Sequence, residues 1–260
     1  MKKTTVFVLR WSLILATTAL VMNGCNDSTM QPTAGSLALS LQYSVTGSPT
    51  AFSKATAFAA AVDSIQLTRV RVVLSEIELE IDNDSADFRT APMVLELDLS
   101  GAMQTIGVMG LPFGTYSEVE FTIHRVDSAD LAIIPPAEQA RFADFLQSPR
   151  ASIIVEGIAY TNGNGQAFTF RSGLVAEQEY ELTPPLTVSD SNPAANITIN
   201  VNSAYWFRDR NGALLDPADP NNAAQISYNI KVSLKAYEDD DRDGDDDDDD
   251  DDDDGGDGDD

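Results

Sequence analysis

The sequence predicts a mostly β protein: an antiparallel β-sandwich of about ten strands with one short helix, over residues 36–238. Three observations lead to this fold class. Apolar residues recur at every second position in most segments, which is the period of a half-buried strand. Polar or Gly/Pro-rich connections separate these segments. Only one segment has helical spacing between prolines. With 260 residues, of which 43% are hydrophobic, the chain can bury one sizeable core.

The first two strands are expected at residues 36–45 and 64–81. Between them, residues 48–62 are rich in alanine and predict either a short helix or an ordered loop. In residues 65–81 the alternation changes parity twice, which predicts bulges or a strand that crosses from one sheet to another. Three blocks define these changes: Ile65 and Leu67, then Val70, Val72 and Leu74, then Ile77, Leu79 and Ile81. A turn is expected at residues 82–87.

The next strands are expected at residues 92–100 and 111–126. In the second of these, Val119, Phe121 and Ile123 face one side of the sheet. The opposite side carries Glu118, Glu120, Thr122 and His124. One face of this strand is therefore expected to be buried and the other to be exposed to solvent.

A short helix is predicted near residues 137–147, between prolines, with Phe142, Phe145 and Leu146 at helical spacing. This helix could instead link two smaller sandwiches. The Asn-Gly pairs within residues 151–173 then predict a hairpin whose Phe168 and Phe170 point inward.

Three strands complete the sandwich, at residues 178–183, 196–202 and 226–237. The last of them has the cleanest alternation in the chain, formed by Ile226, Tyr228, Ile230, Val232 and Leu234.

The N-terminus is typical of a bacterial lipoprotein signal. Lys2, Lys3 and Arg10 precede an apolar run that is too short for a membrane-spanning helix. The run ends at Gly24-Cys25, and Cys25 is the only cysteine of the chain, so it cannot form an internal disulfide. We therefore expect residues 1–24 to be a signal peptide, Cys25 to be lipidated and residues 25–35 to be a flexible tether. Simple secretion is the alternative.

The predicted anchor places the protein in the bacterial cell envelope, held to the membrane by lipid. Asn26 follows the cysteine where an inner-membrane retention signal often has Asp, so the outer membrane is favoured. The sequence leaves open whether the protein faces the periplasm or the surface.

The C-terminus is the most acidic part of the chain. Residues 239–260 contain 17 Asp and one Arg, a formal charge of −16, whereas the whole chain carries −26. No apolar residue follows Tyr237, so this tail cannot bury enough surface to offset its ordering entropy and is expected to be disordered. The acidic balance argues against nucleic acid as a partner. Cations and basic partners fit it better.

The tail also contains the beginning of a Ca²⁺-binding loop. Asp239-x-Asp241-x-Asp243-Gly244 places oxygens at positions 1, 3 and 5 and glycine at position 6. The same register puts Asp245 at position 7, Asp247 at position 9 and Asp250 at position 12. Alternatives to a discrete Ca²⁺ site are diffuse divalent-cation binding by the whole run and a solvated brush without ligand.

The residue inventory offers little for catalysis. One histidine and one cysteine exclude a Cys/His nucleophilic pair and a zinc site of the usual composition. His124 lies on the polar face of its predicted strand and is expected to face solvent. No nucleophile elbow, phosphate loop or dinucleotide-binding fingerprint is present. A hydrolase that uses a carboxylate pair stays possible in so acidic a chain, but no spacing singles out such a pair.

Several segments together resemble a known group of proteins. Leu111-Pro112-Phe113-Gly114-Thr115-Tyr116 is similar to the Leu-Pro-x-Gly-x-Tyr turn that enters a strand in certain sandwiches. With "LTRVRVVLSEIELEI", "VLELDLS" and the closing "ISYNIKVSLKAYEDD", the chain resembles bacterial envelope lipoproteins with a prealbumin-like or carboxypeptidase-regulatory-like β-sandwich, including families catalogued only as domains of unknown function. The resemblance covers most of residues 36–238. It implies a non-enzymatic envelope protein and supplies no catalytic residue.

The leading hypothesis is therefore a lipid-anchored, non-enzymatic envelope or cell-surface sandwich. Its acidic tail would bind divalent cations such as Ca²⁺, basic partners, or surface polymers bridged by cations. An accessory subunit that docks another envelope protein through an exposed strand edge is the alternative. A carboxylate-dependent hydrolase of envelope polymers ranks third.

Overall fold

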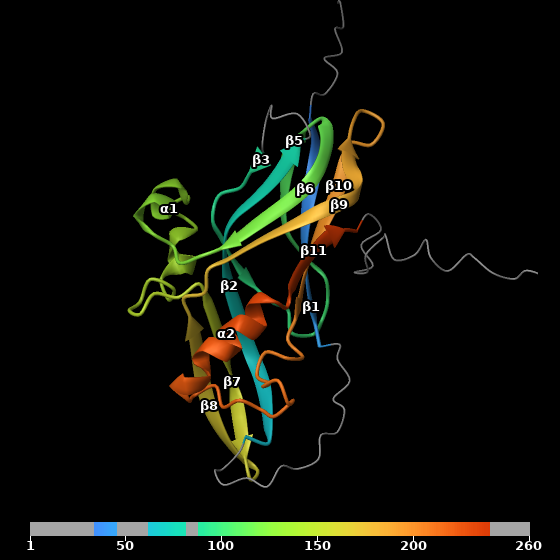
Figure 1. Cartoon of the computed structure of the whole chain (residues 1–260). Helices are drawn as coiled ribbons and strands as arrows, with labels where there is room; N and C mark the ends of the chain where they lie inside the picture. Colours follow the sequence, from blue (N-terminus) through green and yellow to red (C-terminus); the bar gives the residue numbers. More distant parts are fainter. Residues whose placement is uncertain (1–33, 46–61, 82–87, 240–260) are drawn as a thin grey trace, which may run out of the picture. The chain divides into compact units, whose positions relative to one another are not determined.

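Two β-sheets face each other across a shared hydrophobic core (Figure 1). The computed structural model describes residues 34–45, 62–81 and 88–239. The four-stranded sheet has the order β11-β10-β1-β5, from β1 (Ala34–Ser44), β5 (Gln104–Pro112), β10 (Ala194–Asn202) and β11 (Leu234–Glu238). The described residues thus confirm a mostly β sandwich, with eleven strands in two sheets.

The second sheet has seven strands. Its main path is β8-β7-β2-β6-β9, and the short strands β3 and β4 pair with β2. Its members are β2 (Ser64–Ile81), β3 (Phe88–Arg89), β4 (Met93–Glu96), β6 (Gly114–Ile123), β7 (Ile153–Thr161), β8 (Asn164–Ser172) and β9 (Ala176–Val188). Strand pairing is antiparallel except between β1 and β10, which run parallel. One apolar cluster draws on strands from β1 to β11 and contains the fully buried Trp206.

The parity changes predicted in residues 65–81 are bulges within one strand. The register of β2 with β7 shifts between Leu67 and Arg69, and its register with β6 shifts between Leu74 and Glu76. Each shift falls between two of the apolar blocks. Because a bulge adds one residue, it returns the apolar side chains to the same face of the sheet. β2 therefore stays in one sheet over 18 residues.

The hairpin prediction is also confirmed. β7 and β8 are joined by Asn162 and Gly163, whose φ angles are +52° and +77°. Positive φ at both positions is the requirement of a tight two-residue hairpin turn, which Asn-Gly meets best. Phe168 and Phe170 are buried, as expected.

The helix predicted near residues 137–147 is much shorter than expected. The structure has α1 (Ser128–Ile133) earlier in the chain and only a 3₁₀ turn, η1 (Gln139–Phe142), followed by further turns. Phe142 and Phe145 are buried in a second, smaller apolar cluster beneath this segment. Their spacing of three residues suits a 3₁₀ turn, in which side chains at i and i+3 lie one above the other.

The strand predicted at residues 226–237 is wrong over most of its length. Residues Ala223–Lys231 form helix α2, preceded by the 3₁₀ turn η2 (Pro220–Asn222), and only Leu234–Glu238 form a strand. Ile226 and Ile230 are buried, whereas Tyr228 and Val232 are about 60% exposed. Positions four apart share a face in a helix as well as in a strand, so these two isoleucines fit both patterns.

Strand β5 was not expected from the sequence. It carries Gly107 and Gly110, and Val108 is exposed, so it lacks a clean alternation of apolar residues. It nevertheless pairs with β1 along most of its length and forms one edge of the four-stranded sheet. None of the helices in the described part of the chain has the length and apolarity needed to cross a membrane.

Candidate functional site

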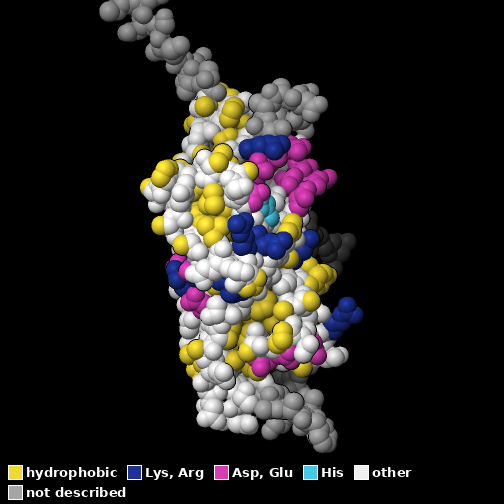
Figure 2. Space-filling model, turned by 90° about the vertical axis from the view of Figure 1, so that its left-hand side faces the viewer, with side chains coloured by type: hydrophobic (Ala, Val, Ile, Leu, Met, Phe, Trp, Pro, Cys, Tyr) yellow, Lys and Arg dark blue, Asp and Glu magenta, His cyan; other side chains and the backbone are white. Residues whose placement is uncertain are grey.

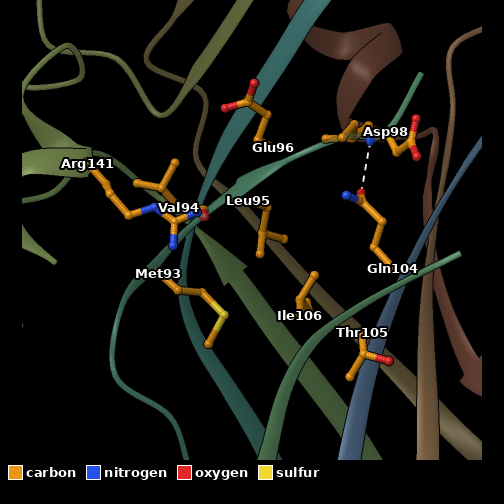
Figure 3. A pocket seen from close by; sticks show the side chains of 10 residues that line it. Met93, Val94, Leu95, Glu96, Asp98, Gln104, Thr105, Ile106 and Arg141 are labelled. Carbon is orange, nitrogen blue, oxygen red and sulfur yellow. Dashed lines mark hydrogen bonds between the residues drawn. The ribbon is translucent and has the colours of Figure 1, made fainter. Parts of the chain in front are cut away.

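One groove on the described residues lies between edge strands of the two sheets. It has a volume of about 620 Å³ and runs between β4 and the beginning of β5 (Figure 3). Leu95 and Ile106 extend from these two strands into the space between them, and Met93 lies beside them. This volume is within the range of ligand-binding sites, although the exposed lining is more polar than apolar.

The charged groups on the rim of the groove are held by near neighbours. Arg69 donates two hydrogen bonds to Glu96, of 2.8 and 2.7 Å, and these bonds lower the pKa of the Glu96 carboxyl. The pKa of Asp98 is also lowered, because its carboxylate accepts from Ser100. The Glu96 charge is thus neutralised by Arg69, whereas the Asp98 carboxylate is stabilised by a main-chain N–H and not by a cation.

The main chain of β4 leaves part of its outer edge available. Leu97 N donates to Val70 O over 3.0 Å, so by alternation the main-chain groups of Val94 and Glu96 point away from β2. Arg141 Nη2 donates to Val94 O over 3.0 Å, and Asp98 N donates to Gln104 Oε1 over 2.8 Å. Within the described residues β4 pairs with no strand besides β2, so Glu96 lies on an uncovered stretch of edge.

A second feature is an array of eight glutamates on one face of the seven-stranded sheet. Figure 2 shows acidic side chains gathered beside basic ones on the upper part of one face of the molecule. In the register of β2, β6 and β9, two complete rows cross the three strands: Glu80–Glu118–Glu181 and Glu78–Glu120–Glu179. Glu76 and Glu177 flank Thr122 in a third row.

Like charges directly opposite one another destabilise a sheet. Burial raises the pKa of Glu118, and the neighbouring Glu179 and Glu80 raise it further. On β3, Arg89 pairs with Glu78 over 2.5 Å and with Glu76 over 3.5 Å, which offsets part of the charge at one end. The array is thus a surface that protonation or cations would stabilise.

The third feature is Asp239, the first residue of the aspartate run. It lies opposite Asn196, just beyond β11, and is fully buried. Thr198 donates to Asp239 Oδ2 over 2.8 Å, and Asn196 Nδ2 donates to the main-chain oxygen of Asp239 over 2.7 Å. Ser40 in turn donates to Asn196 Oδ1 over 2.8 Å. All four residues are at most 2% exposed.

The other carboxylate oxygen of Asp239 has no such partner. Oδ1 is buried, and no hydrogen-bond donor among the described residues reaches it. A buried polar atom without a partner costs about 1–3 kcal/mol, and more when it belongs to a charged group. An oxygen of this kind is usually satisfied by an ordered water or an ion.

Of the predicted site residues, Asp239 alone lies within the described residues. The five other predicted metal ligands and the predicted lipidation site lie outside them: Asp241, Asp243, Asp245, Asp247, Asp250 and Cys25. His124 is partly exposed and its Nδ1 lies 2.9 Å from Arg125 O. Among the residues that the structure describes, no group of three or more His, Cys, Asp or Glu side chains is arranged to hold a metal ion.

Sequence reasoning missed the groove and the array for different reasons. The groove joins β4 and β5, which belong to different sheets, and no sequence pattern says which two edges face each other. The array had a visible signal, because glutamates alternate within residues 76–80, 118–120 and 177–181. Only the register of the sheet shows that these three stretches lie side by side.

Comparisons of the chain with protein-family models, with curated proteins and with solved structures find no match.

Proposed function

We propose that this protein is a lipid-anchored, non-enzymatic β-sandwich of the bacterial cell envelope that binds divalent cations, Ca²⁺ first among them, or basic partners through its acidic C-terminal segment. The observation that carries the proposal is the state of Asp239. This residue is fastened to β10 and buried, yet it keeps one carboxylate oxygen without a partner at the head of the aspartate run.

The cation proposal follows from the chemistry of oxygen ligands. Ca²⁺ is bound by six to eight oxygens, mostly from carboxylates and carbonyls. Asp239 supplies one available carboxylate oxygen, and 16 further Asp follow it within 21 residues. Basic partners would use the same negative charge without a fixed coordination geometry. The two alternatives can be distinguished, because only the cation proposal requires the protein to bind a divalent ion when no other partner is present.

Calcium titration calorimetry on the full chain in detergent tests this function. The matched variant replaces the ten consecutive Asp of residues 245–254 by Asn, which keeps the length of the segment and removes its charge. We expect the native chain to bind several Ca²⁺ ions at micromolar to millimolar affinity in physiological salt, and the variant to bind fewer. Equal and negligible heats from both proteins would refute the cation proposal.

The envelope part of the proposal has a separate test. Gly24-Cys25 after the apolar run supports acylation of Cys25, and Asn26 after the cysteine favours the outer membrane. Labelled fatty acid should be incorporated into the native chain and not into the Cys25→Ser variant. Incorporation into both would show that Cys25 is not the attachment site.

The groove between β4 and β5 favours a second function, that of a docking subunit in an envelope complex. Its uncovered β4 edge offers main-chain groups at Glu96, and the half-buried Met93 and Ile106 offer apolar contacts. These are the features with which a protein accepts an extended segment of a partner as an added strand. Peptides selected for binding to the native chain should lose affinity at least tenfold for an Ile106→Asp variant. Unchanged affinity would place their binding site elsewhere.

A further inference from the structure

The outer edge of β8 is unpaired along the length of the strand. β8 lies at the end of the seven-stranded sheet, next to β7 (Figure 1). Asn164 pairs with Thr161 across the two-residue turn, and at the other end Ser172 O accepts from Ser152 N, so Asn164 and Ser172 both face β7. Backbone groups alternate in direction along a strand. The main-chain groups of four residues therefore point away from the sheet: Gly165, Ala167, Thr169 and Arg171.

Nothing in the described part of the chain satisfies these outward groups. No described residue forms a hydrogen bond with their four N–H and four C=O groups, and Gly165, Ala167 and Thr169 are exposed. β8 runs through nine residues in unbroken register with β7, and it contains no proline, lysine or carboxylate. Prolines, charges and bulges are the features with which proteins protect a sheet edge from pairing.

The other edge strands carry such protection. β9 contains Pro184 and Pro185 together with three glutamates. β5 ends at Pro112, and a bulge interrupts its pairing with β1. β11 has only five residues and carries the exposed Lys235. Of the edge strands that the structure describes, β8 is therefore the long one that is open to a further strand.

We propose that two copies of the chain pair through β8, antiparallel around a two-fold axis at Phe168, so that their seven-stranded sheets join. In this register Gly165 lies opposite Arg171 of the second copy, and Ala167 lies opposite Thr169 of the second copy. These are hydrogen-bonded pairs, so each outward N–H meets a C=O and none is left over. The pairing is independent of cation binding and of the groove beside β4.

Charge and shape make a second copy the partner that fits this edge. The chain carries a net charge of −26, so two copies repel each other over much of their surface. β8 has no carboxylate, and the one carboxylate of β7, Glu156, is paired with Arg71. The axis makes the two Phe168 side chains cross-strand neighbours, and aromatic pairs of this kind stabilise a sheet. Gly165 presents no side chain to the Arg171 that lies opposite.

Sedimentation equilibrium of the full chain in density-matched detergent tests the pairing. A single pair of edge strands is a small interface, so we expect a dimer with a Kd on the order of 10 µM. Ala167→Lys places an exposed charge on the edge, and the two lysines of a dimer would lie diagonally across the axis. It should weaken the dimer at least tenfold without lowering the melting temperature. Val108→Lys is the matched control, because it adds the same charge at an exposed side chain of the β5 edge.

Thr169→Pro is the second variant. It removes an outward N–H that makes no hydrogen bond within the described fold, so it should leave the protein folded and monomeric. Ala167→Lys decides alone should Thr169→Pro fail to fold. A native chain that stays monomeric tenfold above the expected Kd overturns the proposal, as it would if this edge serves a different protein. Equally tight dimers of Ala167→Lys and Val108→Lys also overturn it.

Hydrogen exchange of the native chain gives a signature that needs no variant. The amides of Ala167 and Thr169 should exchange slowly in concentrated protein and quickly after dilution. The amides of Phe168 and Phe170 face β7 and should exchange slowly at both concentrations. This alternation along one strand would locate the interface at the outer edge of β8. Exchange at Ala167 and Thr169 that is independent of concentration in a dimeric sample would contradict the pairing.

Discussion

Arg71 of β2 donates a 2.7 Å hydrogen bond to Asp144, which lies in the turns after η1. The same guanidinium reaches Glu156 of β7 over 3.0 Å and lies over the ring of Phe145 at 5.6 Å. Its side chain is 7% exposed, whereas Asp144 is 47% exposed. One buried cation thus ties the η1 segment to the seven-stranded sheet.

Replacing Arg71 by Leu should lower the free energy of unfolding by about 2 kcal/mol, measured by urea denaturation. The loss is limited because Asp144 and Glu156 stay in contact with water. Arg69→Leu is the control on the same strand, since the Arg69–Glu96 pair is exposed and should cost less than about 1 kcal/mol. Equal losses of unfolding free energy in both variants would show that the buried Arg71 pair stabilises the protein no more than the exposed Arg69 pair.

The glutamate array should make stability depend on pH. The pKa of Glu118 is raised in the folded state, so the folded protein binds its proton more tightly than the unfolded chain does. This contribution is fully present below the unfolded pKa of about 4.3 and is lost as pH rises through the folded pKa. Glu118→Gln should therefore stabilise the protein at pH 7 by about 0.2–1 kcal/mol and change it little near pH 4.

Urea denaturation between pH 4 and pH 8 measures this difference. Glu177→Gln, at the flank of the array opposite Thr122, should show a smaller effect at pH 7. A Glu118→Gln variant that is less stable than the native chain at pH 7 would contradict repulsion within the array.

Tyr116 closes the turn between β5 and β6. Its side chain is fully buried, and its hydroxyl donates to Pro112 O over 2.8 Å. Tyr116→Phe should destabilise the protein by about 1 kcal/mol, because it removes one hydrogen bond and leaves the packing intact. Tyr228→Phe, at a side chain that is 60% exposed, should be neutral in the same denaturation experiment. A neutral Tyr116→Phe would mean that water replaces the hydroxyl.

The β7–β8 turn gives a prediction about backbone conformation alone. Gly163 has a φ of +77°, and a Cβ placed there would meet no atom within 4 Å. Gly163→Ala should therefore cost about 1–2 kcal/mol through the left-handed conformation and not through a clash. Asn162→Gly should be close to neutral, since glycine adopts the same φ of +52° freely. Thermal unfolding of the two variants compares them directly.

The sequence predicted best the elements in which local pattern and sheet geometry agree. The β2 bulges were predicted from the changes of parity in the apolar alternation, and the Asn162-Gly163 turn from the Asn-Gly pair itself. Helix α2 was missed because the spacing of Ile226 and Ile230 suits both a helix and a strand. The sequence signal that favours the helix is Asp219-Pro220, a capping residue and a proline just before it. β5 was missed because its sequence lacks a clean apolar alternation, and it is a strand through its hydrogen-bonded pairing with β1.

The candidate sites were less predictable than the fold. Asp239 was expected as one ligand in a disordered run, yet the structure buries it. Its burial depends on Asn196 and Thr198, more than 40 residues away in the chain. Long-range contacts of this kind leave no local pattern.

β1 pairs in parallel with β10, and β11 runs antiparallel to β10. β1 therefore begins at the end of the four-stranded sheet at which β11 ends. Ala38 pairs with Asn196, and Asp239 lies opposite Asn196 on the other side of β10. β1 begins four residues earlier, at Ala34, so the chain enters and leaves the four-stranded sheet about 16 Å apart, two strand spacings across and four residues along. Residues 26–33 alone separate the proposed anchor from β1, which is at most about 30 Å of chain. Both ends of the described fold therefore lie at the same end of the four-stranded sheet, so a ligand bound there could contact both the start of β1 and the end of β11.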